Sequence, residues 1–175
     1  TGGKVQSASD ITINATQGTW GLTMYDNSLI QSTGGNIDIT ANGTSGGLYT
    51  NTTGGIYASS NTATPTATPT AGGTLTINAT GGSQYGIQMP YGSLVSYGAM
   101  SLTASSTLES IYIYGSGTVK AVGDLTLNAT ATGASQWAIY LNNSRTLQST
   151  AGNISMTATS TAGHGIYING GGIVA

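Results

Sequence analysis

Apolar and polar residues alternate with a period of two in six short segments of this chain. The segments begin at Ile11, Ile37, Leu75, Met100, Leu125 and Ile154. Their third inward position is an alanine in every copy, at Ala15, Ala41, Ala79, Ala104, Ala129 and Ala158. Alternation of this kind is typical of a β-strand with one buried face. The alanine row predicts a narrow corner of the core, because a larger side chain would not fit there.

Two further apolar segments follow each of these strands in a constant order. The second segment begins at Leu22, Leu48, Ile87, Ile111, Ile139 and Ile166, and the third contains Leu29, Ile56, Leu94, Val119, Leu147 and Ile173. Each repeat of roughly 25 residues therefore holds three short strands, and such repeats indicate a solenoid. The sequence predicts an all-β fold, a single-stranded parallel β-helix (β-solenoid) of about six coils in which each coil pairs with the next.

The repeats run through residues 1–175 as one continuous segment with a single insertion. Residues 61–73, NTATPTATPTAGG, are rich in Thr and Pro. Proline cannot donate to a β-ladder, so we expect a loop that projects from the second coil. Val5 and Ile173 fit the same third-strand position, and neither is followed by the polar cap that solenoids usually carry. The segment is therefore expected to belong to a longer array or to stack end to end into a fibre.

Composition narrows the possible partners. Charged residues make up 5% of the chain and the formal net charge is −2, so there is no basic surface for nucleic acid. Cysteine is absent, and the single histidine, His164, has no companions that would complete a metal site. No apolar run approaches the ~20 residues that span a bilayer. We predict no membrane insertion, no metal and no cofactor.

The acidic residues argue against catalysis. Polysaccharide lyases and hydrolases need paired carboxylates, or carboxylates beside Lys or Arg, on neighbouring coils of a β-helix. The acids of this chain are Asp10, Asp26, Asp38, Glu109 and Asp124. No two of them occupy the same position in adjacent coils. The sequence therefore predicts a protein that is not an enzyme.

The outward positions of the first strands form a lattice of Thr, Ser and Asn side chains. Sequons of the form N-x-[ST] lie within it, and the candidate glycan acceptors are Asn14, Asn78 and Asn128. The same flat lattice suits an ice-binding face. The alternative interpretation is structural, because β-branched Thr fits a pleated surface and Asn and Thr form ladders from coil to coil.

The outward positions of the other two strands are more apolar. On the second strands the outward row includes Tyr49, Tyr112, Tyr140 and Tyr167. Tyrosine supplies a large amphipathic contact area at low entropic cost, so this row is a candidate binding or stacking surface for sugars or another protein. On the third strands the candidate row for lateral association is Ile30, Tyr57, Val95 and Val174.

The C-terminal part of the chain carries the motifs of a known family. The run GDLTLNATATGASQWAIYLNNSRTLQSTAGNISMTATSTAGHGIYINGGG resembles the repeat regions of filamentous-haemagglutinin-like large exoproteins and related autotransporter adhesins. Elements of the form G-[DN]-Φ-x-Φ-x-A and G-I-Y-Φ extend the resemblance over nearly the whole chain. The resemblance implies a right-handed β-helix, export by two-partner secretion or through a fused barrel, and a bacterial protein at the cell surface or outside the cell.

Pattern and resemblance together predict a structural shaft or fibre segment of a secreted or surface-exposed adhesin. Such a segment acts in adhesion or self-association. Its expected partners are neighbouring repeats of a longer chain, further copies of itself, and surface glycans. The alternatives are a carbohydrate-binding or carbohydrate-active β-helix and an ice-binding protein.

Overall fold

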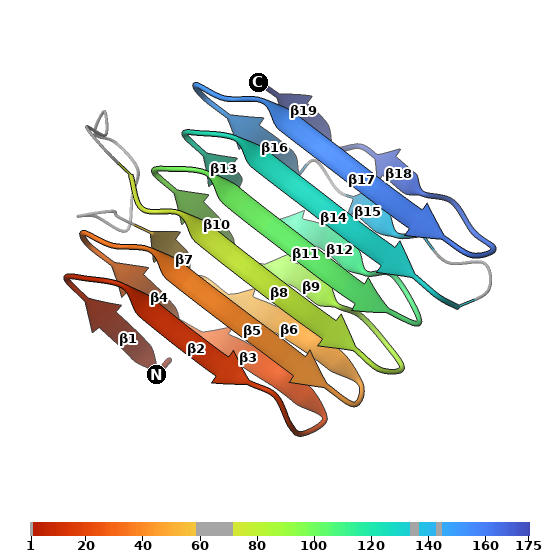
Figure 1. The fold of residues 1–175 in the computed structure, drawn as a ribbon, viewed down its shortest axis with the longest axis horizontal. Helices are drawn as coiled ribbons and strands as arrows, with labels where there is room; N and C mark the ends of the chain where they lie inside the picture. The colour runs from red at the N-terminus through yellow and green to blue at the C-terminus, as the bar shows by residue number, and fades with distance from the viewer. Residues whose placement is uncertain (1, 59–71, 134–136, 143–144) are drawn as a thin grey trace.

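The computed structural model describes residues 2–58, 72–133, 137–142 and 145–175. These residues form 19 β-strands and no helix. The chain winds into a β-solenoid of about six turns with about 26 residues per turn. The coils stack in sequence order from the N-terminus to the C-terminus (Figure 1). The predicted fold class is confirmed.

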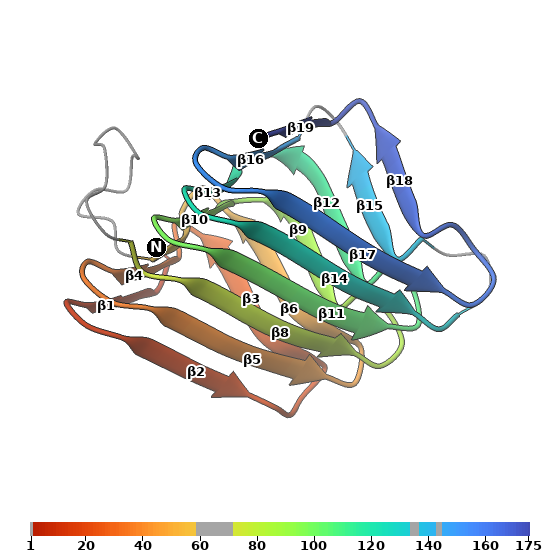
Figure 2. The ribbon, with the colours of Figure 1, turned by 45° about the horizontal axis from the view of Figure 1, so that its top comes forward.

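Three parallel sheets run along the solenoid, one for each strand position of the coil (Figures 1 and 2). The first-strand sheet contains β2 (Ile11–Ala15), β5 (Ile37–Gly43), β8 (Leu75–Gly81), β11 (Met100–Ser106), β14 (Leu125–Ala131) and β17 (Ile154–Ser160). The second-strand sheet contains β3 (Trp20–Asp26), β6 (Gly46–Thr52), β9 (Ile87–Tyr91), β12 (Ile111–Ser116), β15 (Ile139–Asn142) and β18 (Ile166–Asn169). The third-strand sheet contains β1 (Lys4–Ser7), β4 (Leu29–Ser32), β7 (Gly55–Ala58), β10 (Ser93–Ser96), β13 (Val119–Ala121), β16 (Thr146–Ser149) and β19 (Gly172–Val174).

The core consists of aliphatic columns that follow the solenoid axis. In the first-strand sheet the six predicted starting residues pair without a register slip, from Ile11 opposite Ile37 to Leu125 opposite Ile154. The side chains of the middle coils are completely buried; Leu75 and Leu125, for example, are 0% exposed. Burial of apolar side chains is the main contribution to the stability of the fold. In a solenoid each coil obtains this burial from the neighbouring coils alone.

The alanine row marks a narrow corner, as the pattern predicts. The six alanines pair in one column, and the glycines that begin the second-strand segments lie against them. A Cβ added to Gly86 would come within 2.8 Å of the Ala104 Cβ, and one added to Gly47 within 2.8 Å of the Ala79 Cβ. Small residues on both sides of the corner therefore allow close backbone approach.

Buried serines connect the turns that lead from the third strand into the next coil. Ser32 Oγ donates to the Ser9 carbonyl at 2.9 Å, and Ser96 Oγ donates to the Gly73 carbonyl at 2.9 Å. Ser149 repeats this arrangement two coils later. All three side chains are at most 1% exposed, so each hydroxyl satisfies a buried carbonyl of the preceding turn.

The third-strand prediction is wrong at one position. Ile30, expected to face outward, pairs with Val5 and Ile56 and lies in the main core at 4% exposure. Leu29, expected to face inward, pairs with Lys4 and Gly55 and packs outside that core. Two apolar residues are adjacent here, so alternation alone does not decide which of them points inward.

Candidate functional site

The second-strand sheet carries an aromatic face along its outer side. Its outward row has the predicted register, with Tyr49 opposite Gln88, Gln88 opposite Tyr112, and Tyr140 between Tyr112 and Tyr167. Residues next to the row add further rings. We define the aromatic face as two groups of rings in mutual contact. One group is Trp20, Tyr25 and Tyr49, and the other is Tyr85, Tyr112, Tyr114, Trp137, Tyr140 and Tyr167.

The rings of the C-terminal coils stack mainly on one another. The centroids of Tyr112 and Tyr140 are 4.9 Å apart with an interplanar angle of 10°, and those of Tyr112 and Tyr114 are 4.3 Å apart at 25°. Trp137 stacks on Tyr167 at 5.2 Å and 24°. Offset stacking at these distances stabilises a pair beyond its buried area. Because these ring faces already contact other rings, this part of the aromatic face stabilises the stack of coils, and its role as a binding surface stays a prediction.

Gln88 joins the two ends of the aromatic face. Its side-chain amide donates to the Tyr114 hydroxyl at 3.3 Å. On the N-terminal side of this bridge, Tyr49 contacts Trp20 at 5.3 Å and Tyr25 at 5.5 Å, both with tilted rings. The aromatic face therefore extends from the first coil to the last.

A buried carboxylate lies beside this face. Glu109 precedes β12 and is 7% exposed. Burial raises the pKa of Glu109, although its own backbone N–H stabilises the charged form and lowers it in part. Burial also raises the pKa of Tyr112 to about 12, and the nearby tyrosines and Glu109 add to the effect. The Tyr112 phenol consequently remains a neutral hydrogen-bond donor at physiological pH.

Two of the other acidic residues bind backbone in turns between coils. Asp10 Oδ1 accepts from the Asn36 N–H at 2.7 Å, and Asp124 Oδ1 accepts from the Asn153 N–H at 2.8 Å. These contacts are the turn chemistry expected of aspartate before a strand. Within the described residues, no three His, Cys, Asp or Glu side chains come together in an arrangement that would hold a metal ion.

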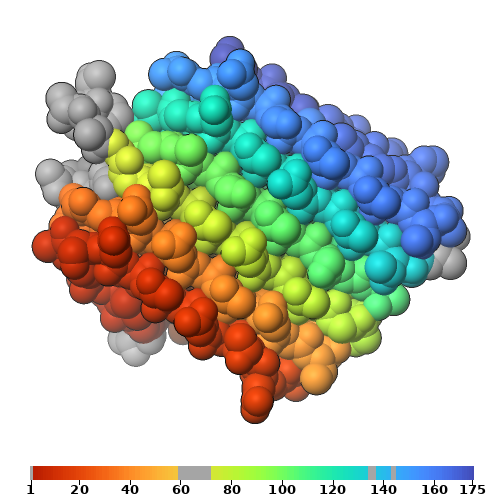
Figure 3. Space-filling model, viewed as in Figure 1, coloured from red at the N-terminus to blue at the C-terminus, as the bar shows by residue number. Residues whose placement is uncertain are grey.

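The candidate glycan acceptors lie on the outer side of the first-strand sheet. Asn14 and Asn78 are exposed and Asn128 is partly exposed. Figure 3 shows that the coils form parallel bands across this side of the molecule. The lattice of Thr, Ser and Asn side chains thus has the register that the sequence predicts, and its role as a glycosylated or ice-binding surface stays a prediction.

The candidate row for lateral association is mostly buried. Tyr57 and Val95 are opposite each other in the outward register but are only 6% and 3% exposed, and they pack with Tyr97 in a second apolar cluster. Val174 is 49% exposed, and Ile30 is in the core. These residues therefore do not form one exposed apolar row. The Thr/Pro loop predicted over residues 61–73 lies outside the described residues except for Gly72 and Gly73.

Arg145 is a buried residue that the repeat pattern does not indicate as a candidate. It is 1% exposed, and its guanidinium reaches back across two coils to backbone carbonyls. Nη2 donates to the carbonyl oxygens of Tyr114 at 3.0 Å, Pro90 at 3.2 Å and Met89 at 3.4 Å. Nη1 donates to the Gly92 carbonyl at 3.2 Å, and Nε donates to the Tyr114 carbonyl at 3.2 Å. Burial lowers the pKa of Arg145 to about 10, so the side chain remains charged at neutral pH.

Comparison with other proteins adds no family to this description. No family model, no curated protein and no solved structure matches this chain. The resemblance to large exoproteins therefore rests on the repeat motifs alone. In the described part of the chain, no helix has the length and apolar character of a membrane span.

Proposed function

We propose that this chain is a structural shaft segment of a secreted or surface-exposed adhesin, and that it is not an enzyme. The observation that carries the proposal is the unbroken parallel register of the first-strand sheet through all six coils. Six coils at about 4.8 Å per strand give a rod roughly 30 Å long. Regular coils with an aliphatic core and interlocked turns suit a spacer that sets reach and stiffness.

Self-association, or continuation by further repeats, is part of the proposal. In the last described coil Ile166, Ile168 and Ile173 are 40%, 43% and 41% exposed. The equivalent residues of the preceding coil, Ile139, Leu141 and Leu147, are all 0% exposed. Another coil stacked on β17, β18 and β19 would bury these apolar side chains, whether it came from the same polypeptide or from a second copy.

Removal of one whole coil tests the spacer function. In the full-length protein on the cells that produce it, deletion of residues 125–153 joins Asp124 to Ile154 in the original phase. A spacer should remain at the cell surface, detected by antibody on intact cells, and should retain adhesion with a shorter reach. The matched control deletes residues 125–138, which breaks the phase and should abolish folding. Loss of adhesion by a folded, surface-exposed one-coil deletion would contradict the spacer function.

A further inference from the structure

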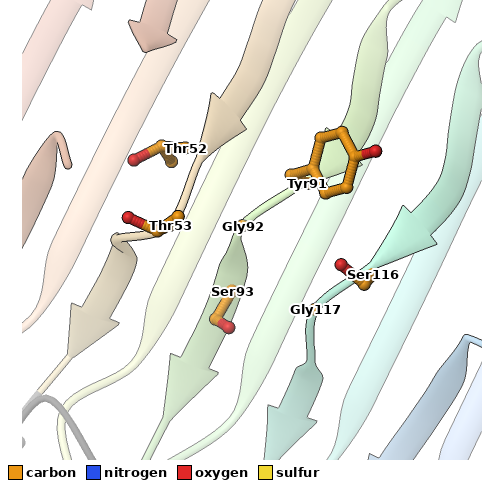
Figure 4. A pocket seen from close by; sticks show the side chains of 7 residues that line it. All are labelled: Thr52, Thr53, Tyr91, Gly92, Ser93, Ser116 and Gly117. Carbon is orange, nitrogen blue, oxygen red and sulfur yellow. The ribbon is translucent and has the colours of Figure 1, made fainter. Parts of the chain in front are cut away.

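A shallow groove lies where the second strands turn into the third strands. It consists of two adjoining pockets with volumes of about 340 and 170 Å³ that share Thr52, Thr53 and Tyr91. The larger pocket also reaches Tyr25 and Asp26. Figure 4 shows the smaller pocket, which reaches Ser116. We call this feature the corner groove. It crosses the ends of β3, β6, β9 and β12, so it runs along the solenoid axis over four coils.

Two exposed tyrosines flank the corner groove. Tyr25 is 52% exposed and Tyr91 is 50% exposed. Tyr91 makes no ring contact within the described residues, and Tyr25 makes one tilted contact, with Tyr49. These two rings differ from Tyr112 and Tyr140, whose faces stack on each other. The corner groove therefore offers aromatic faces that a ligand can cover.

Polar groups of several kinds also line the corner groove. Asp26 supplies a carboxylate, Asn51 an amide, and Thr53 and Ser116 supply hydroxyl groups. The set includes both donors and acceptors, and the carboxylate is its only charged group. Pockets that combine apolar surface with a few placed polar groups are typical of small-molecule sites.

Backbone contacts hold the groove in shape. Asp26 has a φ of 57°, the only positive φ of a non-glycine residue in the described part of the chain. Its carbonyl accepts from the Thr53 N–H at 2.7 Å and from Thr52 Oγ1 at 2.6 Å. The Tyr91 carbonyl accepts from Thr50 Oγ1 at 2.8 Å. Aspartate tolerates this conformation in turns. The hydrogen bonds fix the backbone of the groove before a ligand binds, which lowers the entropic cost of binding.

We infer that the corner groove binds a neutral saccharide chain lying along the shaft axis. Tyrosine rings pack against the apolar C–H faces of a sugar. Its hydroxyl groups donate to Asp26 and to Thr53 Oγ1, whose own proton goes to Asn27 Oδ1, and accept from Ser116. An acidic saccharide would be repelled by Asp26 and by the formal net charge of −2. A peptide bound as an added strand is disfavoured over most of the groove, because strand addition needs an unpaired sheet edge. β6, β9 and β12 are paired on both sides, and only β3 lies at the edge of the sheet. This inference adds a recognition site to the shaft and does not depend on the spacer function.

Titration calorimetry on the purified 175-residue chain tests the inference. The neutral probes are cellohexaose, maltohexaose, xylohexaose and mannohexaose, and the acidic comparison is hexagalacturonate. We expect at least one neutral probe to bind and hexagalacturonate not to bind. Tyr91→Ala should weaken binding about tenfold or more, the equivalent of about 1.4 kcal/mol. The matched control, Tyr167→Ala, removes an exposed tyrosine far from the groove and should leave binding unchanged.

A second variant separates recognition from folding. Asp26→Asn preserves a side chain that tolerates a positive φ, so the fold should be retained. We expect weaker binding of the neutral probe and less discrimination against hexagalacturonate. Circular dichroism and the thermal midpoint should match the parent for both groove variants. The inference is overturned if no neutral probe binds at millimolar concentration, if a neutral probe binds equally well to Tyr91→Ala, or if hexagalacturonate is preferred. None of these results bears on the coil-deletion experiment.

Discussion

Replacement of Arg145 by methionine should destabilise the protein by about 3 kcal/mol. The guanidinium donates to four carbonyls, and a hydrogen bond to a charged group contributes about 1.5–3 kcal/mol. Even at the low end, the four acceptors lose about 6 kcal/mol in total. Burying the charge opposes this: the lowered pKa of about 10 corresponds to about 3 kcal/mol of desolvation, at about 1.36 kcal/mol per pKa unit. Methionine keeps the apolar stem but removes both the hydrogen bonds and the desolvation cost. The lost hydrogen bonds outweigh the desolvation cost that is avoided, so the free energy of unfolding should fall.

Urea unfolding followed by circular dichroism measures this difference. Arg145→Lys should be destabilised at least as much, because lysine keeps the buried charge but cannot reach carbonyls in two coils at once. Lys120→Met removes a partly exposed cation from the neighbouring third strand and should change the free energy of unfolding by less than about 0.5 kcal/mol. If Arg145→Met proves as stable as the parent or more stable, the charge is a net burden and the reasoning is refuted.

Three further predictions concern the core and the aromatic face. Leu102→Ala should lower the free energy of unfolding in urea by about 3–4 kcal/mol, because Leu102 is 0% exposed. The equivalent change in the last coil, Met156→Ala, should lower it much less, because Met156 is partly exposed. Equal losses would contradict the description in which each coil is stabilised by its neighbours. Because the pKa of Glu109 is raised in the folded state, its contribution to stability is present below about pH 4.5 and is lost as the pH rises through the folded-state pKa. Glutamine has no charge to bury, so Glu109→Gln should raise the urea midpoint more at pH 7 than at pH 4. The raised pKa of Tyr112 stabilises the fold up to about pH 10 and this contribution disappears by about pH 12. Tyr112→Phe should therefore lose less stability than the parent between those two pH values.

The regular parts of the fold could be predicted because each inward position repeats in every coil. A one-residue slip in the first strand would expose a whole column, from Ile11 to Ile154, so the pattern determines the register strongly. The same reasoning fails in β4. There Leu29 and Ile30 are both apolar, so alternation fits either register, and only the pairing of Ile30 with Val5 and Ile56 shows that Ile30 reaches the core.

The candidate sites depend on contacts that do not repeat. Arg145 occurs once, and its acceptors are backbone carbonyls, which leave no trace in the side-chain pattern. Tyr25 and Tyr91 lie at the ends of β3 and β9 and pair with Asn51 and Ser116 rather than with other tyrosines. The repeat pattern therefore indicates the row of Tyr112 and Tyr140 instead. The distinction between rings that stack on each other and rings that remain open needs side-chain positions in three dimensions.

The direction of the hydrogen bonds between coils has a mechanical consequence. All three sheets are parallel, and their inter-strand hydrogen bonds point along the solenoid axis. A force that separates the two ends therefore breaks the hydrogen bonds of one coil before those of the next coil are loaded. Such a molecule should unravel coil by coil, and each coil of about 26 residues would release up to about 90 Å of extended chain. A tether built in this way yields gradually under load and absorbs work at every step.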